Sequence, residues 1–378
     1  MDPGDTDGAA GHGRRSRRPD VSIVREEVLA AKAYEVPASD GLLKLDAMEN
    51  PYGLPEALRR ELASRLARLE LNRYPPANPR EFKERLAGAI GLPAGQAVML
   101  GNGSDELIRL VVQACARPGA AVLSPWPSFV MYAMSARFCG CRFVGVPLTA
   151  GFEIDLQATL EALATHRPAL TFVAWPNNPT GTLFDRAAVE AIVEAAPGAV
   201  VLDEAYLPFV QDTFLPELVT HGNLLVLRTM SKLGLAGIRL GYLCGDPAWI
   251  AEFEKVRTPY NVSSLTLAAA ALMLDHLPVL EEQAARVRAE RARVLASLRA
   301  LPGVATFESA ANFVLFRVAR PHDVFERLRE RGILIRNVSD MHPMLSGCLR
   351  ATVGRPEEND RFLEALAGAL APGDPPAA

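Results

Sequence analysis

The sequence predicts an α/β protein whose larger part is a mostly parallel sheet covered by helices on both faces. Between about residues 97 and 244, short apolar runs alternate with amphipathic stretches, and the apolar runs are nearly continuous. Continuous apolar strands are typical of parallel sheets buried on both faces. From about residue 264 the pattern changes to a long helical stretch followed by short strands and helices, which predicts a smaller α+β domain.

The elements follow from local patterns, taken in order. Residues 104–116 (SDELIRLVVQACA) have helical apolar spacing, and Ser104 is the expected N-cap because its hydroxyl can satisfy free backbone N–H groups. The turn residues of PNNPTG end the strand at 169–175, and Pro302-Gly303 ends the helical stretch at 264–300. We expect further strands at 97–100, 120–124, 142–148, 199–206, 223–230, 238–244, 313–318, 332–336 and 349–353, and helices at 128–138, 185–196, 322–331 and 357–370.

These patterns divide the chain into five parts. Residues 1–20 are rich in Gly, Asp and Arg and poor in apolar residues, so we expect a disordered tail, with RRSRR solvated and not a targeting signal. The predicted parts are the tail 1–20, an N-terminal arm 21–50, a large domain 51–263, a small domain 264–371 and a second tail 372–378.

Composition excludes several classes of protein. The chain has 378 residues, 49% of them apolar and 22% charged, with a net charge of -4, which disfavours a broad nucleic-acid-binding surface. The longest apolar run, 265–274, is too short to span a bilayer and predicts a buried helix. Five scattered cysteines without a CxxC motif suit a reducing cytoplasm, and the six histidines have no metal-binding spacing. We therefore expect no membrane, nucleic-acid or metal partner.

Polar residues of unusual type follow several predicted strands. The turn Asn177–Gly181 follows one strand, Asp203 and Tyr206 end another, and Ser231-Lys232 follows a third. The glycine-rich turn Gly101–Ser104 opens a helix, where free N–H groups can bind a phosphate. Because α/β sheets bind ligands beyond the carboxyl ends of their strands, we expect these groups to meet.

Each of these features alone is ordinary, but together they describe a site for pyridoxal 5'-phosphate. A lysine amine forms a Schiff base with the cofactor aldehyde, and an aspartate pairs with the pyridinium nitrogen. Lys232 and Asp203 are the residues of these types, and Ser231 with Arg239 suits the cofactor phosphate.

The stretches NNPTG, DEAY and SKLGLAGIRLGY resemble the fold-type-I pyridoxal-phosphate-dependent aminotransferases, and within them the histidinol-phosphate aminotransferase family. MENPYG, NRYP, GNGSDELI and SGCLRATVG extend the resemblance to about residues 21–370. The resemblance implies a homodimer in which glutamate aminates the cofactor and the cofactor aminates a phosphorylated keto substrate. In histidine biosynthesis, this would convert imidazole-acetol phosphate and L-glutamate into L-histidinol phosphate and 2-oxoglutarate.

The resemblance also implies residue roles. Lys232 and Asp203 would be catalytic. Asn178 and Tyr206 would bind the ring hydroxyl, and Phe129 would stack on the ring. The implied cofactor-binding set is Ser104, Asp105, Phe129, Asn178, Asp203, Tyr206, Ser231, Lys232 and Arg239, with Tyr74 from the other subunit. Arg350 would take the carboxylate of the amino donor. Independently of the resemblance, a phosphate dianion favours a second positive charge, for which Arg336 is the candidate, and Tyr34 and Asn50 are expected to close over the substrate.

The sequence departs from the family at one place. Arg239 follows Lys232 by seven residues, one fewer than in the commoner family form, so we expect the loop to tighten at Gly234 and Gly237.

Other functions stay open from the sequence. An aromatic amino-acid aminotransferase and a phosphothreonine decarboxylase of corrin biosynthesis would use the same scaffold. A transcription regulator with a cofactor-binding module would need about sixty further N-terminal residues for a DNA-binding domain. Only about twenty residues precede the catalytic pattern, which disfavours the regulator.

Overall fold

The computed structural model describes residues 20–33 and 37–371. The chain forms two units, one up to Val36 and one from Pro37 onward. In the first unit, a single helical turn, α1 (Glu26–Leu29), leaves Ile23 and Leu29 exposed. The predicted tails, apart from Asp20, and the candidate residue Tyr34 lie outside the described residues.

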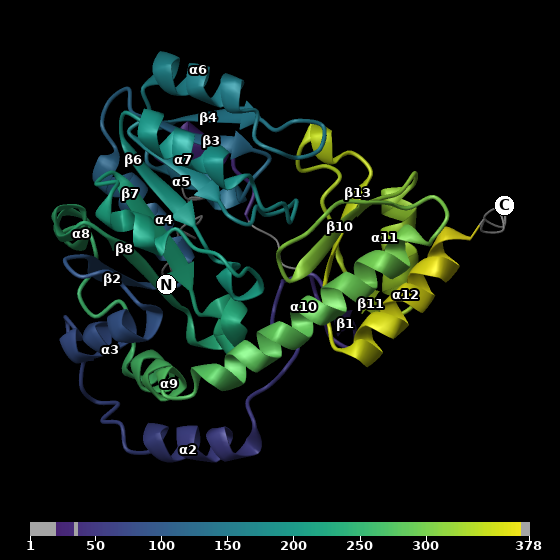
Figure 1. The fold of residues 1–378 in the computed structure, drawn as a ribbon, viewed down its shortest axis with the longest axis horizontal. Coiled ribbons are helices and arrows are strands. Elements are labelled where there is room, and N and C mark those ends of the chain that lie inside the picture. Colours follow the sequence, from purple (N-terminus) through teal and green to yellow (C-terminus); the bar gives the residue numbers. More distant parts are fainter. Residues whose placement is uncertain (1–19, 34–36, 372–378) are drawn as a thin grey trace, which may run out of the picture. The chain divides into compact units, whose positions relative to one another are not determined.

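The larger sheet of the second unit has seven strands in the order β2-β8-β7-β6-β5-β3-β4 (Figure 1). Only β8 runs antiparallel to its neighbours β2 and β7, which confirms the predicted mostly parallel sheet. The strands are β2 (Ala97–Asn102), β3 (Ala121–Trp126), β4 (Arg142–Pro147), β5 (Leu170–Ala174), β6 (Ala199–Asp203), β7 (Leu224–Thr229) and β8 (Leu240–Gly245).

Helices cover both faces of this sheet. Alternate strand residues pack into two separate cores, because successive side chains of a strand point to opposite faces. One face is covered by α4 (Ser104–Cys115), α5 (Val130–Phe138) and α8 (Pro247–Glu254). The other is covered by α3 (Arg80–Ile90), α6 (Leu156–His166), α7 (Arg186–Ala195) and α9 (Ser264–Leu274), with α2 (Glu56–Leu66) packed on α9.

The C-terminal part forms a smaller sheet with its own core. The antiparallel order is β12-β13-β10-β9, and β1 pairs with β11 in parallel. Helix α10 (Leu277–Arg299) runs from α9 to this sheet (Figure 1). The remaining elements are β1 (Leu43–Lys44), β9 (Ala305–Thr306), β10 (Phe313–Arg317), α11 (Pro321–Glu330), β11 (Ile333–Leu334), β12 (Arg336–Asn337), β13 (Cys348–Thr352) and α12 (Pro356–Leu370).

The structure corrects three predicted elements. Gly103, at a φ of 78°, is the N-cap of α4, so Ser104 is the first helical residue and makes no side-chain cap. The stretch 264–300 is two helices bent by 80°, because α9 ends at Leu274 and Pro278 occupies the first turn of a new helix. The strand 332–336 divides between two sheets, since β11 pairs with β1 and β12 with β13.

No single helix among the described residues is long and apolar enough to cross a bilayer. Among these residues, only the bent pair α9 and α10 has the necessary length and apolar composition when the two helices are taken together.

Candidate active site

A cavity of about 180 Å³ lies at the carboxyl ends of β5, β6 and β7. Nine of the ten residues predicted to bind the cofactor line it, and only Tyr74 does not. The lining residues are Met48, Ser104, Asp105, Phe129, Tyr132, Ala174, Pro176, Asn178, Asp203, Ala205, Tyr206, Thr229, Ser231, Lys232 and Arg239.

Lys232 enters this cavity from the tight turn Ser231–Leu235 that follows β7. Its Nζ donates a hydrogen bond to the carbonyl oxygen of Ala47 at 3.2 Å and lies 5.7 Å from the centre of the Tyr206 ring. Burial, with the nearby positive charge of Arg350, lowers the pKa of the Lys232 amine to about 8. The amine is therefore partly unprotonated near neutral pH, as a nucleophile or a base must be.

Asp203, at the end of β6, supplies a carboxylate to the same cavity. The Tyr132 hydroxyl donates to its Oδ2 at 2.7 Å, and the backbone N–H of Ala205 donates to its Oδ1 at 3.0 Å. Burial raises the pKa of Asp203 to about 6, although both hydrogen bonds act to lower it. The charged form of this carboxylate is thus short of a cationic partner, which a protonated ring nitrogen would provide.

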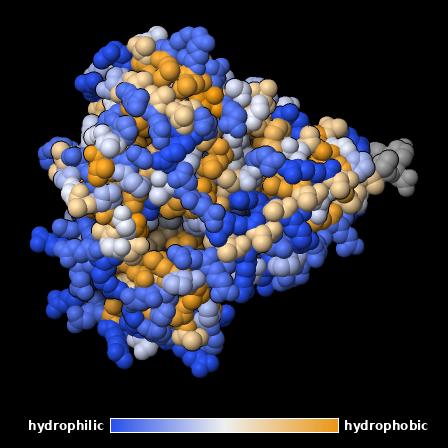
Figure 2. All heavy atoms as spheres, viewed as in Figure 1, coloured by the Kyte–Doolittle hydropathy of each residue, from blue (hydrophilic) through white to orange (hydrophobic). Residues whose placement is uncertain are grey.

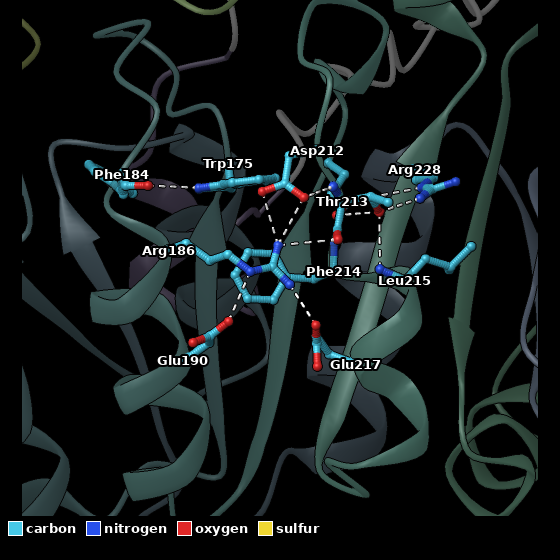
Figure 3. A network of polar contacts seen from close by, with 11 residues as sticks. Trp175, Phe184, Arg186, Glu190, Asp212, Thr213, Phe214, Leu215, Glu217 and Arg228 are labelled. Carbon is cyan, nitrogen blue, oxygen red and sulfur yellow. Dashed lines mark hydrogen bonds and ion pairs between the residues drawn. The ribbon is translucent and has the colours of Figure 1, made fainter.

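The next residue, Glu204, joins a polar network with Arg228 of β7. Glu204 Oε2 accepts from Arg228 Nε at 2.9 Å, and Thr213 donates to Glu204 while it accepts from Arg228. Figure 3 shows this network, in which Thr213 lies between Arg228 and the charged cluster around Arg186. Because the Glu204–Arg228 pair joins the ends of β6 and β7, it fixes Asp203 relative to Lys232.

A corner whose groups suit an anion lies where α4 begins. The N-terminus of α4 provides free backbone N–H groups, and Arg239 Nη1 donates to Ser231 Oγ at 3.1 Å. Arg239 Nη2 lies 3.4 Å from Asp105 Oδ2, so the shortened loop still brings the arginine to this corner. The loop tightens at Gly234, with a φ of 121°, and at Arg239, with a φ of 53°.

Two glycines keep this corner open. A Cβ on Gly103 would lie 2.5 Å from Arg239 Nη2, and a Cβ on Gly241 would lie 2.5 Å from the backbone nitrogen of Ser104. Gly241 belongs to β8, where it is paired with Gly101. The close approach of strand and turn therefore needs glycine.

Arg350 of β13 does not line the cavity, but it contacts a residue that does. It is buried, and it donates to Asn178 Oδ1 at 2.6 Å and to the Asp46 carbonyl oxygen at 3.1 Å. Arg336 of β12 is its direct cross-strand partner. Two arginines are thus paired across adjacent strands, and Arg350 contacts Asn178. This arrangement suits an anionic substrate group.

The aromatic candidates form the cavity walls. Phe129 precedes α5 and packs edge-on against Tyr132, with ring centres 5.7 Å apart. Tyr206 is buried and packs edge-on against Phe313 of β10.

Besides the two arginines, Tyr74 and Asn50 also lie away from the cavity lining. Tyr74 is 80% exposed and stacks on Tyr260, with ring centres 4.6 Å apart. Asn50 bonds the backbone of Leu233 and the side chain of Gln283.

Sequence reasoning missed Tyr132, Met48 and Thr229 as lining residues. A signal for Tyr132 was present, because it follows Phe129 by three residues at the start of a helix and so shares its face. Met48 and Thr229 carry no comparable signal, since neither residue type indicates a ligand.

A reactive amine and a buried carboxylate face one cavity, which Arg239 lines and whose lining residue Asn178 is bonded to Arg350. These groups define an enzyme that acts on anionic carbonyl or amine compounds. The sequence profile of the family "Aminotransferase class I and II" matches residues 40–366. The chain belongs to this aminotransferase family.

Curated relatives of the chain agree on a branch of this family. It is 56% identical over 353 residues to histidinol-phosphate aminotransferase 2 of Cupriavidus pinatubonensis, covering 92% of this chain and 96% of that one. It is 55% identical to histidinol-phosphate aminotransferase 1 of Ralstonia nicotianae, covering 92% and 94%. These relatives confirm the resemblance found in the sequence.

Solved structures agree on the fold. The histidinol-phosphate aminotransferase of Sinorhizobium meliloti, crystallised with pyridoxal-5'-phosphate, has a TM-score of 0.82 and 24% identity, covering 93% of this chain and 98% of that one. The predicted fold class is confirmed.

Proposed function

We propose that this chain is a pyridoxal-phosphate-dependent histidinol-phosphate aminotransferase of L-histidine biosynthesis. It interconverts L-histidinol phosphate and 2-oxoglutarate with imidazole-acetol phosphate and L-glutamate. The observation that carries the proposal is the meeting of Lys232 and Asp203 in one cavity, in a chain whose curated relatives carry this enzyme name at 54–56% identity.

The residues of the cavity fit this cofactor. The buried carboxylate of Asp203 favours a cationic ring nitrogen, and the amine of Lys232 suits an aldehyde. The α4 N-terminus, Ser231 and Arg239 suit a phosphate. When bound, the cofactor supplies an aldehyde that condenses with amines and a ring that accepts electron density.

The protein contributes positioning and proton transfer. Asp203 holds the proton on the ring nitrogen, and Tyr132 orients Asp203 through its hydrogen bond. Lys232 Nζ, with a pKa near the working pH, would take the proton from the substrate carbon that bears nitrogen and deliver it to the former aldehyde carbon, and would act in the reverse sense in the other half-reaction. Asn178 and Tyr206 are assigned to the ring hydroxyl, and Phe129 to the ring face.

The substrate assignment rests on the relatives and on the paired arginines. Histidinol phosphate carries a phosphate ester and no α-carboxylate, whereas glutamate carries two carboxylates. Guanidinium groups pair bidentately with either anion. We assign Arg350 to both substrates and Arg336 to the second charge of the phosphate, because they are neighbours across β12 and β13. Tyr34 completes the substrate set as predicted from the sequence, whereas the bonds of Asn50 to Leu233 and Gln283 do not favour the substrate role predicted for it.

The enzyme is proposed to be a cytoplasmic homodimer. Tyr74 is exposed and stacked on Tyr260, and Leu71 and Leu265, also exposed, line the same surface hollow. A tyrosine in this position does not contribute to the cavity of its own chain, which supports a role in the cavity of the other subunit.

Two experiments test the function. Borohydride reduction of purified enzyme should attach the cofactor irreversibly to Lys232, as located by peptide mass mapping; a label elsewhere refutes the site. A panel of amine donors, followed through the absorbance of the bound cofactor, should rank histidinol phosphate above phenylalanine and tyrosine. The reverse ranking would favour an aromatic amino-acid aminotransferase.

A further inference from the structure

A buried amide on the long helix α10 contacts the segment that holds Lys232. Gln283 is 8% exposed, and the other buried residues of α10 are all apolar. Burying an amide in such a place costs free energy unless both its ends are hydrogen-bonded. Both ends are bonded here: Nε2 donates to the carbonyl oxygen of Gly53 at 3.1 Å, and Oε1 accepts from Asn50 Nδ2 at 3.1 Å.

Asn50 connects Gln283 to the turn Ser231–Leu235, called the lysine turn because it carries Lys232. Its Nδ2 also donates to the carbonyl oxygen of Leu233 at 3.3 Å, and its Oδ1 accepts from the backbone N–H of Tyr52 at 2.9 Å. Leu233 is the residue directly after Lys232. Because both ends of its amide are used within the protein, Asn50 is oriented toward the lysine turn.

The lysine turn is shaped to fit this pair. Gly234 has a φ of 121°, and a Cβ at this position would lie 2.9 Å from Asn50 Nδ2 and 3.5 Å from Gln283 Oε1. The same N-terminal segment accepts the Lys232 Nζ hydrogen bond at Ala47. Segment 47–53 therefore contacts the backbone of Leu233, next to the lysine, and the amine of Lys232 itself.

We propose that Gln283 and Asn50 are positioning residues that act as a unit to hold the Lys232 turn for proton transfer. Neither side chain lines the cavity, so each acts through the turn and not on the ligand. For Asn50 this replaces direct substrate contact as the role that its bonds support. The proposal rests on the proposed function, in which Lys232 carries the proton.

The test compares Gln283→Leu, Asn50→Ala and the double variant with Val287→Ala. Val287 is fully buried one turn further along α10 and makes only packing contacts in the same helix, so it controls for lost stability alone. Since a small misplacement of a reacting group slows catalysis strongly, each positioning variant should lower kcat about ten- to a hundredfold. KM should change less than about threefold, because the ligand contacts remain.

A second readout does not need the cofactor. The pH dependence of Lys232 acylation, followed by mass spectrometry on cofactor-free protein, reports the pKa of the amine. A loosened turn admits water, so this pKa should rise from about 8 toward 10.5 in Gln283→Leu and stay unchanged in Val287→Ala. The double variant should be no slower than the worse single variant, as expected for residues that act as a unit.

Three results overturn the inference: an unchanged kcat and Lys232 pKa in the positioning variants, the same changes in Val287→Ala, or additive losses in the double variant. Circular dichroism and thermal unfolding confirm that each variant is folded, and Asn50→Ala provides a second route if Gln283→Leu does not fold. A wild-type protein without transaminase activity would instead refute the proposed function.

Discussion

Replacing Tyr132 with phenylalanine removes one hydroxyl and changes the ionisation of Asp203. The phenol donates to Asp203 Oδ2 at 2.7 Å, and both side chains are buried. A hydrogen bond to a charged group contributes about 1.5–3 kcal/mol. At about 1.4 kcal/mol for each pKa unit, its loss should raise the pKa of Asp203 by about one to two units. The starting value is about 6, so the carboxyl would become largely protonated near neutral pH.

Cofactor affinity should report this change. If binding needs the ionised carboxylate, Tyr132→Phe should weaken it about two- to tenfold at pH 7 and about five- to fiftyfold at pH 6, with no difference at pH 9. The assay is an absorbance titration of cofactor-free enzyme with pyridoxal phosphate across this range. The ratio of variant to wild-type affinity cancels the titration of Lys232, which both proteins share.

Tyr242→Phe is the matched control. Tyr242 is also buried, but its hydroxyl bonds Arg228 and lines a different cavity. Its removal should leave the affinity ratio flat with pH. A flat ratio for Tyr132→Phe as well would refute the argument that this hydrogen bond controls the ionisation of Asp203.

Three further variants test other parts of the site. Burial raises the pKa of Asp203 from 3.8 to about 6. The protonated carboxyl therefore contributes to the stability of the folded protein fully below about pH 3.8, and this contribution is lost as the pH rises through 6. Asp203→Asn should therefore stabilise cofactor-free protein against urea at pH 8, by at most about 3 kcal/mol, and much less at pH 4, while abolishing transamination. A gain of equal size at both pH values would contradict this. Arg336→Ala should lower kcat/KM for histidinol phosphate about ten- to a hundredfold and affect glutamate less, since charged hydrogen bonds contribute about 1.5–3 kcal/mol. Equal losses for both substrates would exclude a phosphate role for Arg336. Mixing Lys232→Ala with an inactive Tyr74→Ala protein should restore activity in hybrid dimers that keep one intact site, and a fully active dilute monomer would exclude the shared site.

The sequence was sufficient to predict the sheet and most of the cavity. Continuous apolar strands indicated a parallel sheet, and the polar residues that follow them had to meet because parallel strands end at one edge. Asp203, Asn178 and Lys232 line the same cavity for this reason. Their chemical types then indicated the cofactor.

Features that depend on long-range contacts were not predictable in this way. The division of 332–336 between two sheets depends on β1, which lies nearly three hundred residues earlier in the chain. The bond between Tyr132 and Asp203 depends on how α5 packs against the sheet. Pro278 was a local signal for the bend between α9 and α10. The sequence pattern alone, however, does not show whether a proline begins a new helix or lies within a longer one.

The packing of Gly241 against the start of α4 has a consequence for directed evolution. Gly241 has no side chain and does not line the cavity, yet any other residue there would push its Cβ into the backbone at Ser104. Libraries that randomise Arg336 or the other proposed substrate-binding positions can explore new amine donors on an intact scaffold. Libraries that also randomise Gly241 would lose variants whatever their substrate preference. Any residue other than glycine at this position would disturb the contact between strand β8 and the start of α4.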